Sequence, residues 1–166
     1  MNRTHRTPDE IAAVYGRQMP TVWRVCRTYM KNTADTEDAA SETFLALIRS
    51  DPAFESEEHE KAWLIRTACN ICRSMLRRAY RKNASLEALA DEGDRPEFAA
   101  PEDEEDRRLW EAVEALPERY RVTVFLYYFE GYRTEEIAGI LKKPSSTVRN
   151  WLSEARKMLR ERMGEG

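Results

Sequence analysis

Apolar residues recur at intervals of three and four along most of the chain. Near its end, for example, Val148, Leu152, Ala155 and Leu159 follow this spacing. A period close to 3.6 residues places such side chains on one face of an α-helix. Segments with the alternating pattern of a β-strand are absent from the sequence, and only 6 Gly and 7 Pro interrupt its 166 residues. We therefore predict an all-α protein.

The net charge of −3 hides three strongly charged segments. Residues Lys61 to Lys82 carry seven basic side chains and no acidic one, a net charge of +7. Residues Asn83 to Asp106 have a net charge of −9, and Lys142 to Arg162 have a net charge of +5. Basic helical segments are typical of nucleic-acid-binding surfaces, even in a chain that is acidic overall.

The acidic segment also divides the chain. It contains Gly93, Pro96 and Pro101 and few large apolar residues, and its like charges repel one another, which favours an extended linker. The sequence thus predicts two small helical domains, at residues 9–82 and 107–163, joined by an acidic linker at residues 83–106.

Two helices are expected in the first half of the N-terminal domain. The first begins at Pro8 and is kinked or split at Pro20. The second is capped by Asp35 or Thr36 and ends at Asp51. The apolar side chains that the second helix is expected to bury are Ala39, Ala40, Phe44, Leu45 and Ile48.

A third helix is expected from about Lys61 to Lys82, after an acidic loop from Phe54 to Glu60. It contains a C-x-x-C pair, Cys69 and Cys72. Redox chemistry and zinc binding are the alternatives for such a pair, but redox pairs usually begin a helix and zinc requires more ligands. We interpret both cysteines as small packed apolar residues, and we expect no metal site.

The segment from Thr134 to Arg156 is a helix-turn-helix candidate. A short apolar helix leads into the turn Lys142-Lys143-Pro144, and Ser145 or Ser146 then caps a last helix that runs to about Met163. Its polar side is expected to present Arg149, Asn150, Ser153, Arg156, Lys157 and Arg160. A DNA-recognition helix needs polar side chains at its first turns, where it enters the major groove. A plain helical hairpin with a solvated basic face remains the alternative.

Three segments of the chain resemble parts of the sigma-70 family of RNA polymerase sigma factors. LPERYRVTVFLYYFEGYRTEEIAGILKKPSSTVRNWLSEARKMLRE resembles region 4, the domain that reads the −35 promoter element. DTEDAASETFLALI and AWLIRTACNICRSMLRR resemble the two helices of region 2 in the small extracytoplasmic-function class. The order of these motifs, with an acidic linker and no separate region 3 domain, also matches that class.

The resemblance implies roles for individual residues. The two acidic residues Asp38 and Glu42, on one face of a helix, would bind core polymerase. Four residues would face the −10 element: Asn70, Arg73, Arg77 and Arg78. The acidic loop from Phe54 to Glu60 would help to hold an unstacked base of the melted strand. Residues expected at the −35 element are Lys142, Lys143, Ser146, Thr147, Arg149, Asn150 and Ser153.

The implied function is binding to core RNA polymerase and promoter-specific initiation of transcription. The expected partners are the β′ and β subunits of the core enzyme, promoter DNA and an anti-sigma factor. The small number of cysteines fits a reducing, cytoplasmic setting, and no apolar run is long enough to span a membrane. No catalytic motif appears, so we expect a protein that is not an enzyme and needs no cofactor. A stand-alone helix-turn-helix regulator, or a sigma-like protein that does not support initiation, is the alternative.

Overall fold

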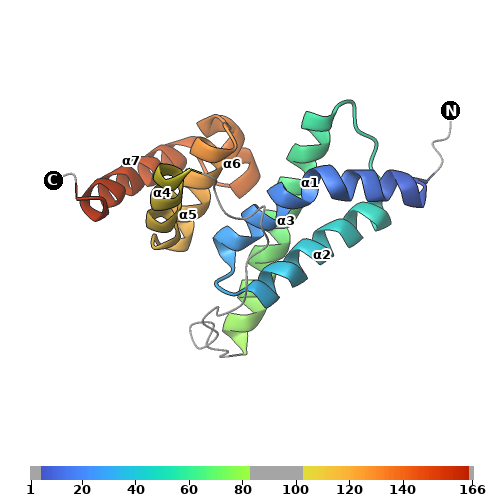
Figure 1. Cartoon of the computed structure of the whole chain (residues 1–166), viewed down its shortest axis with the longest axis horizontal. Helices are drawn as coiled ribbons and strands as arrows, with labels where there is room; N and C mark the ends of the chain where they lie inside the picture. The colour runs from blue at the N-terminus through green and yellow to red at the C-terminus, as the bar shows by residue number, and fades with distance from the viewer. Residues whose placement is uncertain (1–4, 83–102, 165–166) are drawn as a thin grey trace. The chain divides into compact units, whose positions relative to one another are not determined.

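The computed structural model describes residues 5–82 and 103–164, and every regular element within these two ranges is a helix (Figure 1). The all-α class predicted from the sequence is therefore confirmed. The chain divides into two compact units between Asp94 and Arg95. We call the described residues 5–82 the first unit and 103–164 the second unit. No helix in either range is long and apolar enough to cross a lipid bilayer.

Three helices form the first unit: α1 (Pro8–Tyr29), α2 (Thr33–Ser50) and α3 (Glu57–Arg81). Each helix packs on the other two, and Trp23, Leu47 and Leu64 fill the centre. Helix α1 is one continuous helix through Pro20, so the predicted split is absent. Residues of α1 on both sides of the proline are buried, so packing against α2 and α3 keeps the helix continuous.

Helix α2 begins earlier than predicted, because Asn32 and not Asp35 or Thr36 is its cap. The Asn32 side-chain oxygen accepts a hydrogen bond of 2.8 Å from the Asp35 backbone N–H. The helix ends where predicted, since Asp51 adopts the left-handed conformation, with φ of 43°.

The buried face of α2 also differs from the prediction. Ala39, Ala40 and Phe44 are buried as expected, but Leu45 and Ile48 are 41% and 46% exposed. Threonines 36 and 43 take part of the inner face, since each hydroxyl donates to the backbone carbonyl four residues earlier and leaves no unpaired polar group.

Helix α3 begins inside the predicted acidic loop. The Ser56 hydroxyl accepts from the His59 N–H, and Glu57, Glu58 and Glu60 lie in the first turn. Carboxylates at this end are favoured by the positive end of the helix dipole. The loop between α2 and α3 is thus confined to residues 51–56.

The second unit contains α4 (Glu104–Glu114), α5 (Glu118–Val124), a π-helical turn η3 (Phe125–Phe129), α6 (Thr134–Leu141) and α7 (Ser145–Arg162). Helix α4 takes up residues 104–106, which the sequence places at the end of the linker, because Asp103 caps it. The remainder of that linker prediction, residues 83–102, lies outside the described residues.

The aromatic residues of α4 and η3 form the core of the second unit. Trp110, Phe125 and Phe129 contact one another with ring centroids 5.4–5.8 Å apart. In the π turn, the Glu130 N–H donates to the Phe125 carbonyl, and Gly131, with φ of 75°, then ends the helix.

Candidate nucleic-acid interface

Helix α7 has a buried face and an exposed polar face. Val148, Leu152 and Ala155 are at most 2% exposed and pack the helix against α5 and α6. This packing fixes its rotation, so that Arg149, Asn150 and Ser153 are exposed at its first turns. The geometry is that of a helix whose N-terminal side chains are available to base edges in a groove.

The turn between α6 and α7 carries the other residues predicted for this surface. Lys142 and Lys143 are exposed, and Lys142 reverses the chain in the left-handed conformation, with φ of 57°. Pro144, and not Ser145 or Ser146, occupies the cap position, and its extended backbone leads into the helix. Ser146 is exposed and Thr147 is half-buried. The structure therefore brings together all seven residues predicted for the −35 element.

Helix α6 is anchored at its start by an acidic side chain. Arg133 is the residue before the helix, and its N–H donates to the Glu136 carboxylate at 3.0 Å. This hydrogen bond lowers the pKa of Glu136. Ile137, Ile140 and Leu141 are buried, and α7 packs on α6.

Arg156 extends the polar face of α7, and its sequence position alone predicts no role in DNA binding. Its guanidinium donates to the Tyr128 hydroxyl and lies 5.7 Å from the ring centroids of Tyr127 and Tyr128. The hydrogen bond to Tyr128 raises the pKa of Arg156. The contact joins residues 28 apart through the π turn, which no local pattern in the sequence indicates.

The four residues predicted for the −10 element lie on α3 but differ in their surroundings. Arg73 is half-buried and donates to Asn70 Oδ1 at 2.6 Å and to the Tyr29 hydroxyl at 3.1 Å. Arg77 and Arg78 are exposed near the end of the helix. Arg73 and Asn70 therefore form a fixed pair, whereas Arg77 and Arg78 present their charges to solvent.

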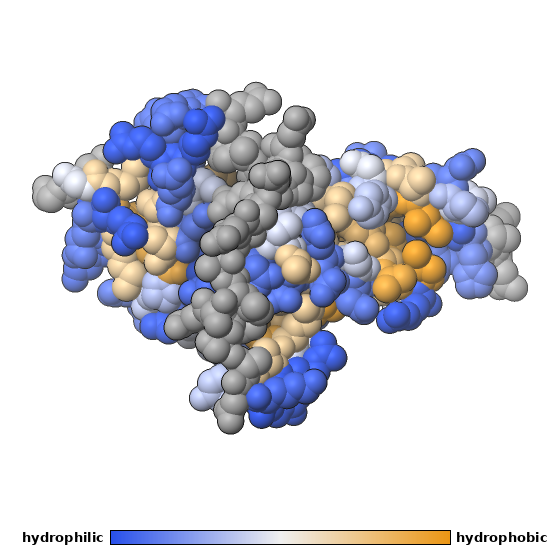
Figure 2. All heavy atoms as spheres, turned by 60° about the horizontal axis from the view of Figure 1, so that its bottom comes forward, coloured by the Kyte–Doolittle hydropathy of each residue, from blue (hydrophilic) through white to orange (hydrophobic). Residues whose placement is uncertain are grey.

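Asp38 and Glu42 are exposed on one face of α2, as predicted. The exposed Leu45 and Ile48 continue from Glu42 along the helix, and Tyr15 of α1 is 48% exposed. Figure 2 shows apolar residues gathered between hydrophilic ones on this unit. The sequence assigned these leucine and isoleucine side chains to the core, so the apolar part of this surface was missed.

The comparisons with known proteins agree with this geometry. A family profile described as Sigma-70 region 2 matches residues 14–82, and one described as Sigma-70, region 4 matches residues 106–159. The extracytoplasmic-function (ECF) sigma factor SigE of Mycolicibacterium smegmatis is 33% identical over 147 residues. The chain belongs to the sigma-70 family, in its extracytoplasmic-function class.

Relatives in this family differ in how much of their length the chain spans. The match covers 84% of this chain but 56% of SigE. The sigma factor CarQ of Myxococcus xanthus is 29% identical over 160 residues, with 95% of this chain and 91% of CarQ covered. SigV of Bacillus subtilis is 29% identical, with 83% and 81% covered.

Two solved structures share the fold of this chain. In one of them the similar protein is a sigma factor by name. One is RpoE of Bartonella quintana in complex with the anti-sigma factor NepR, with a TM-score of 0.69, 21% identity, and 90% of this chain and 94% of that chain covered. The other is CnrH in complex with the cytosolic domain of CnrY, with a TM-score of 0.61, 19% identity, and 96% and 90% covered. We therefore call the first unit the region 2 unit and the second the region 4 unit.

The cysteines of the region 2 unit lie in its core. Cys26, Cys69 and Cys72 are fully buried, as the packed interpretation predicted for the last two. Burial raises the pKa of the Cys69 thiol to about 12, which disfavours the reactive thiolate. Within residues 5–82 and 103–164, no group of three or more His, Cys, Asp or Glu side chains is placed to hold a metal ion.

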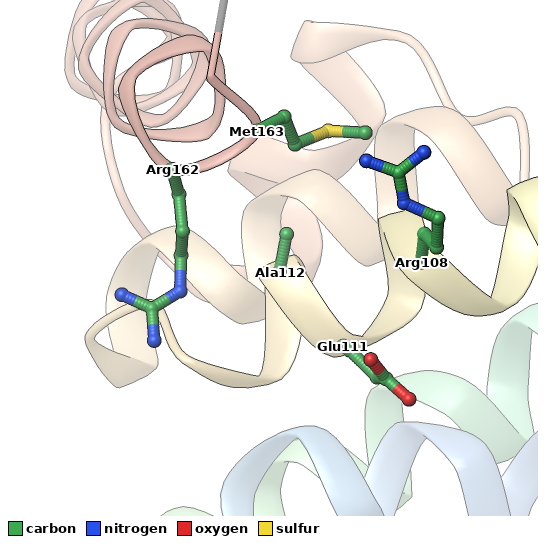
Figure 3. Close-up of a pocket in the computed structure, with 5 residues that line it drawn as sticks. All are labelled: Arg108, Glu111, Ala112, Arg162 and Met163. Atoms are coloured by element: carbon green, nitrogen blue, oxygen red, sulfur yellow. The ribbon is translucent and has the colours of Figure 1, made fainter.

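A pocket in the region 4 unit lies between α4 and the end of α7 (Figure 3). Its lining comprises Arg108, Glu111 and Ala112 of α4 with Arg162 and Met163. Arg162 is separated from Arg149 by more than three helical turns, which is about 20 Å along the axis. The pocket is therefore separate from the polar face at the start of α7.

Proposed function

We propose that this chain binds core RNA polymerase and directs it to promoters, where transcription starts. The observation that carries the proposal is the pairing of two units in the order of the family. The region 2 unit ends in an exposed basic helix segment, and the region 4 unit presents an exposed polar recognition helix. Two DNA-facing surfaces on one chain suit the two elements of a promoter.

At the −35 element, α7 lies in the major groove. Arg149, Asn150 and Ser153 reach base edges, because they are exposed and held at a fixed rotation by the buried face of the helix. The residues that contact phosphates are Lys142, Lys143, Ser146 and Thr147. Base contacts supply the sequence preference, and phosphate contacts supply affinity that falls with salt.

At the −10 element, α3 follows the DNA backbone. The exposed Arg77 and Arg78 neutralise phosphates, and the Arg73 side chain holds Asn70 in one orientation toward the DNA. The loop at residues 51–56 and the aromatic ring of Trp63 hold an unstacked base of the melted strand, since Trp63 and Phe54 are both partly exposed.

The exposed carboxylates of Asp38 and Glu42 bind basic side chains of the β′ subunit, and the chain also contacts the β subunit. An anti-sigma factor controls access to the polymerase, a partner type seen in the solved complex of the similar protein RpoE with NepR. The two units are joined by an acidic linker, which is shorter than the predicted 83–106 because residues 104–106 belong to α4. The protein works in the cytoplasm and catalyses no reaction itself.

A transcription assay with a promoter library tests the proposal. Purified bacterial core polymerase, with and without this chain, transcribes fragments in which the −35 and −10 elements are randomised, and the transcripts are sequenced. The proposal predicts transcripts that depend on the chain and share two preferred elements. DNA binding by the chain without any transcript above core enzyme alone supports the stand-alone regulator instead.

The polymerase surface is tested separately. We expect Asp38→Arg to reduce the affinity for core polymerase at least tenfold, about the effect of placing like charges in contact across an interface. Asp9→Arg is the matched control, because Asp9 is also exposed but lies at the start of α1. Equal core binding by the two variants removes the Asp38 surface from the proposal.

A further inference from the structure

One side chain ahead of α1 is bonded to the loop that follows α2. The Arg6 guanidinium donates to Asp51 Oδ1 at 2.6 Å through Nη1 and to the Pro52 carbonyl at 2.6 Å through Nη2. It also lies 5.0 Å from the centroid of the Phe54 ring. Figure 1 shows this loop passing beside the first turns of α1. A single side chain thus contacts three residues of the loop.

These contacts are sheltered from water. The Arg6 side chain is 7% exposed and that of Asp51 is 13% exposed. His5 also contacts Asp51, at 3.0 Å, but its side chain is exposed. Charge-assisted hydrogen bonds are about twice as strong as neutral ones, and burial reduces their screening. Asp51 has a left-handed backbone conformation, which aspartate adopts more readily than most residues other than glycine.

The other end of the loop is fixed by α3. The Phe54 ring lies 5.3 Å from the His59 ring and 5.9 Å from the Trp63 ring, measured between centroids. The Glu55 N–H donates to His59 Nδ1 at 3.1 Å. Phe54 is therefore placed between the Arg6 guanidinium and the aromatic side chains of α3.

We infer that Arg6 is a positioning residue for promoter recognition: it holds the loop at residues 51–56 in the conformation that receives an unstacked −10 base. The inference rests on the proposed function. Arg6 acts through Asp51, Pro52 and Phe54 and does not itself touch DNA, since its side chain is almost fully buried. A preformed loop avoids the cost of ordering on binding, and so improves discrimination between bases. Arg6 also precedes residues 14–82, which the region 2 profile matches.

Two substitutions that change the charge in opposite directions distinguish a positioning role of Arg6 from a simple electrostatic attraction of its charge to DNA. Arg6→Ala removes a positive charge, and Asp51→Asn removes a negative one. If charge alone mattered, the first would weaken DNA binding and the second would strengthen it. Positioning predicts that both impair recognition, and that the double variant is no worse than Arg6→Ala, because the two residues act through one contact.

The test uses the full chain with core polymerase and the randomised promoter library described above. Wild type is expected to select a −10 element. In Arg6→Ala and Asp51→Asn the preference at one or two adjacent −10 positions should fall about tenfold, the discrimination of one good base contact. Selection at −35 and affinity for core polymerase should not change. Arg6→Lys, which keeps the charge but lacks the planar fork, should show an intermediate loss and covers the case in which Arg6→Ala is unstable.

Unchanged −10 selection in Arg6→Ala and Arg6→Lys overturns the inference. A loss spread equally over −10, −35 and core binding also overturns it, because a merely structural residue would act in that way. Stronger selection of the −10 element by Asp51→Asn than by wild type also overturns the inference. If wild type itself yields no transcripts above core enzyme alone, the proposed function fails and the inference falls with it, which is a different result from identical selection by wild type and variants.

Discussion

The helices of the region 2 unit and those of the helix-turn-helix begin in different ways. Helices α1, α2 and α3 follow Thr7, Asn32 and Ser56, and each of these side chains accepts a hydrogen bond from a backbone N–H of the first turn. Helix α7 follows Pro144, and no side chain caps it. Helix α6 likewise follows a residue whose side chain has no acceptor.

The difference indicates which molecule supplies the hydrogen-bond acceptors for the backbone N–H groups at the start of each helix. A side-chain cap satisfies the first-turn N–H groups from within the protein. In the first turn of α7 the Thr147 N–H donates to the Pro144 carbonyl, so the donors left beside Lys142 and Lys143 are the N–H groups of Ser145 and Ser146. Backbone N–H groups at a helix N-terminus bind phosphate oxygens well. The first-turn N–H groups of the region 2 helices are thus bonded within the protein, whereas those left at the start of the recognition helix are suited to hydrogen bonds with DNA phosphates.

The largest effect is expected from core substitutions, which test whether the region 2 and region 4 units are stabilised independently. Leu64 and Leu152 are 0% and 2% exposed in the region 2 and region 4 units respectively. We expect Leu64→Ala and Leu152→Ala each to lower the free energy of unfolding of its own unit by about 2–5 kcal/mol, because a buried leucine leaves a cavity. Hydrogen exchange resolved by peptide should show faster exchange in the mutated unit alone. Faster exchange in both units with either variant would mean that they fold as one.

A second prediction separates base contacts from general attraction. Arg149→Ala should weaken binding to the −35 element by about 1–3 kcal/mol and relax its sequence preference. Lys157→Ala is the matched control, because it removes the same charge from an exposed site two turns further along α7. We expect the control to lower affinity for all sequences slightly and equally. A footprinting titration at fixed salt measures both, and equal preference in the two variants would remove Arg149 from the base-reading set.

A third prediction concerns an ion pair that joins α1 to α3 in the region 2 unit. Arg17 binds the Glu60 carboxylate through two hydrogen bonds of 2.9 Å, and Gln18 donates a third at 3.0 Å. Burial raises the pKa of Glu60, but these bonds outweigh it, so the pKa lies below its ordinary value of 4.5. Because Arg17 is partly exposed, we expect Glu60→Gln to lower the free energy of unfolding by only about 1–2 kcal/mol at pH 7.

The sign of the pH dependence follows from that lowered pKa. A carboxyl that is more acidic in the folded state stabilises the fold above its unfolded pKa. Its contribution is lost as the pH falls through the folded value. The difference in free energy of unfolding between wild type and Glu60→Gln should therefore be constant above about pH 5 and shrink on acidification. Denaturant unfolding at several pH values measures it, and a difference that grows in acid would contradict this assignment.

Local patterns in the sequence predicted the helices well and the contacts between distant residues poorly. The buried face of α7 was predictable because Val148, Leu152 and Ala155 lie on one side of the helix and no polar residue is buried among them. The α2 face was not, since Thr36 and Thr43 satisfy their own hydroxyls and displace Leu45 and Ile48 from the core. Contacts such as Arg6 with Asp51 and Arg156 with Tyr128 join residues 45 and 28 positions apart and depend on the packed fold.

The smallest expected effect tests the uncapped start of α7 directly. Pro144 has an extended backbone, with φ of −61° and ψ of 147°, which asparagine and aspartate also adopt. Either residue can cap the helix, and this gain of about 1 kcal/mol roughly offsets the loss of proline rigidity. Pro144→Asp and Pro144→Asn should therefore have similar stability, while only Pro144→Asp adds a negative charge beside the phosphates.

We expect Pro144→Asp to bind −35 DNA about threefold more weakly than Pro144→Asn, a difference below 1 kcal/mol, as for a charge at a helix end. The difference should shrink as salt is raised, because exposed charges are screened. Measuring binding of both variants over a salt series gives the contribution of charge at this helix end, apart from the cap itself. If the two variants bind equally at low salt, phosphate does not lie at the start of α7, and the contrast between the two units has no bearing on DNA.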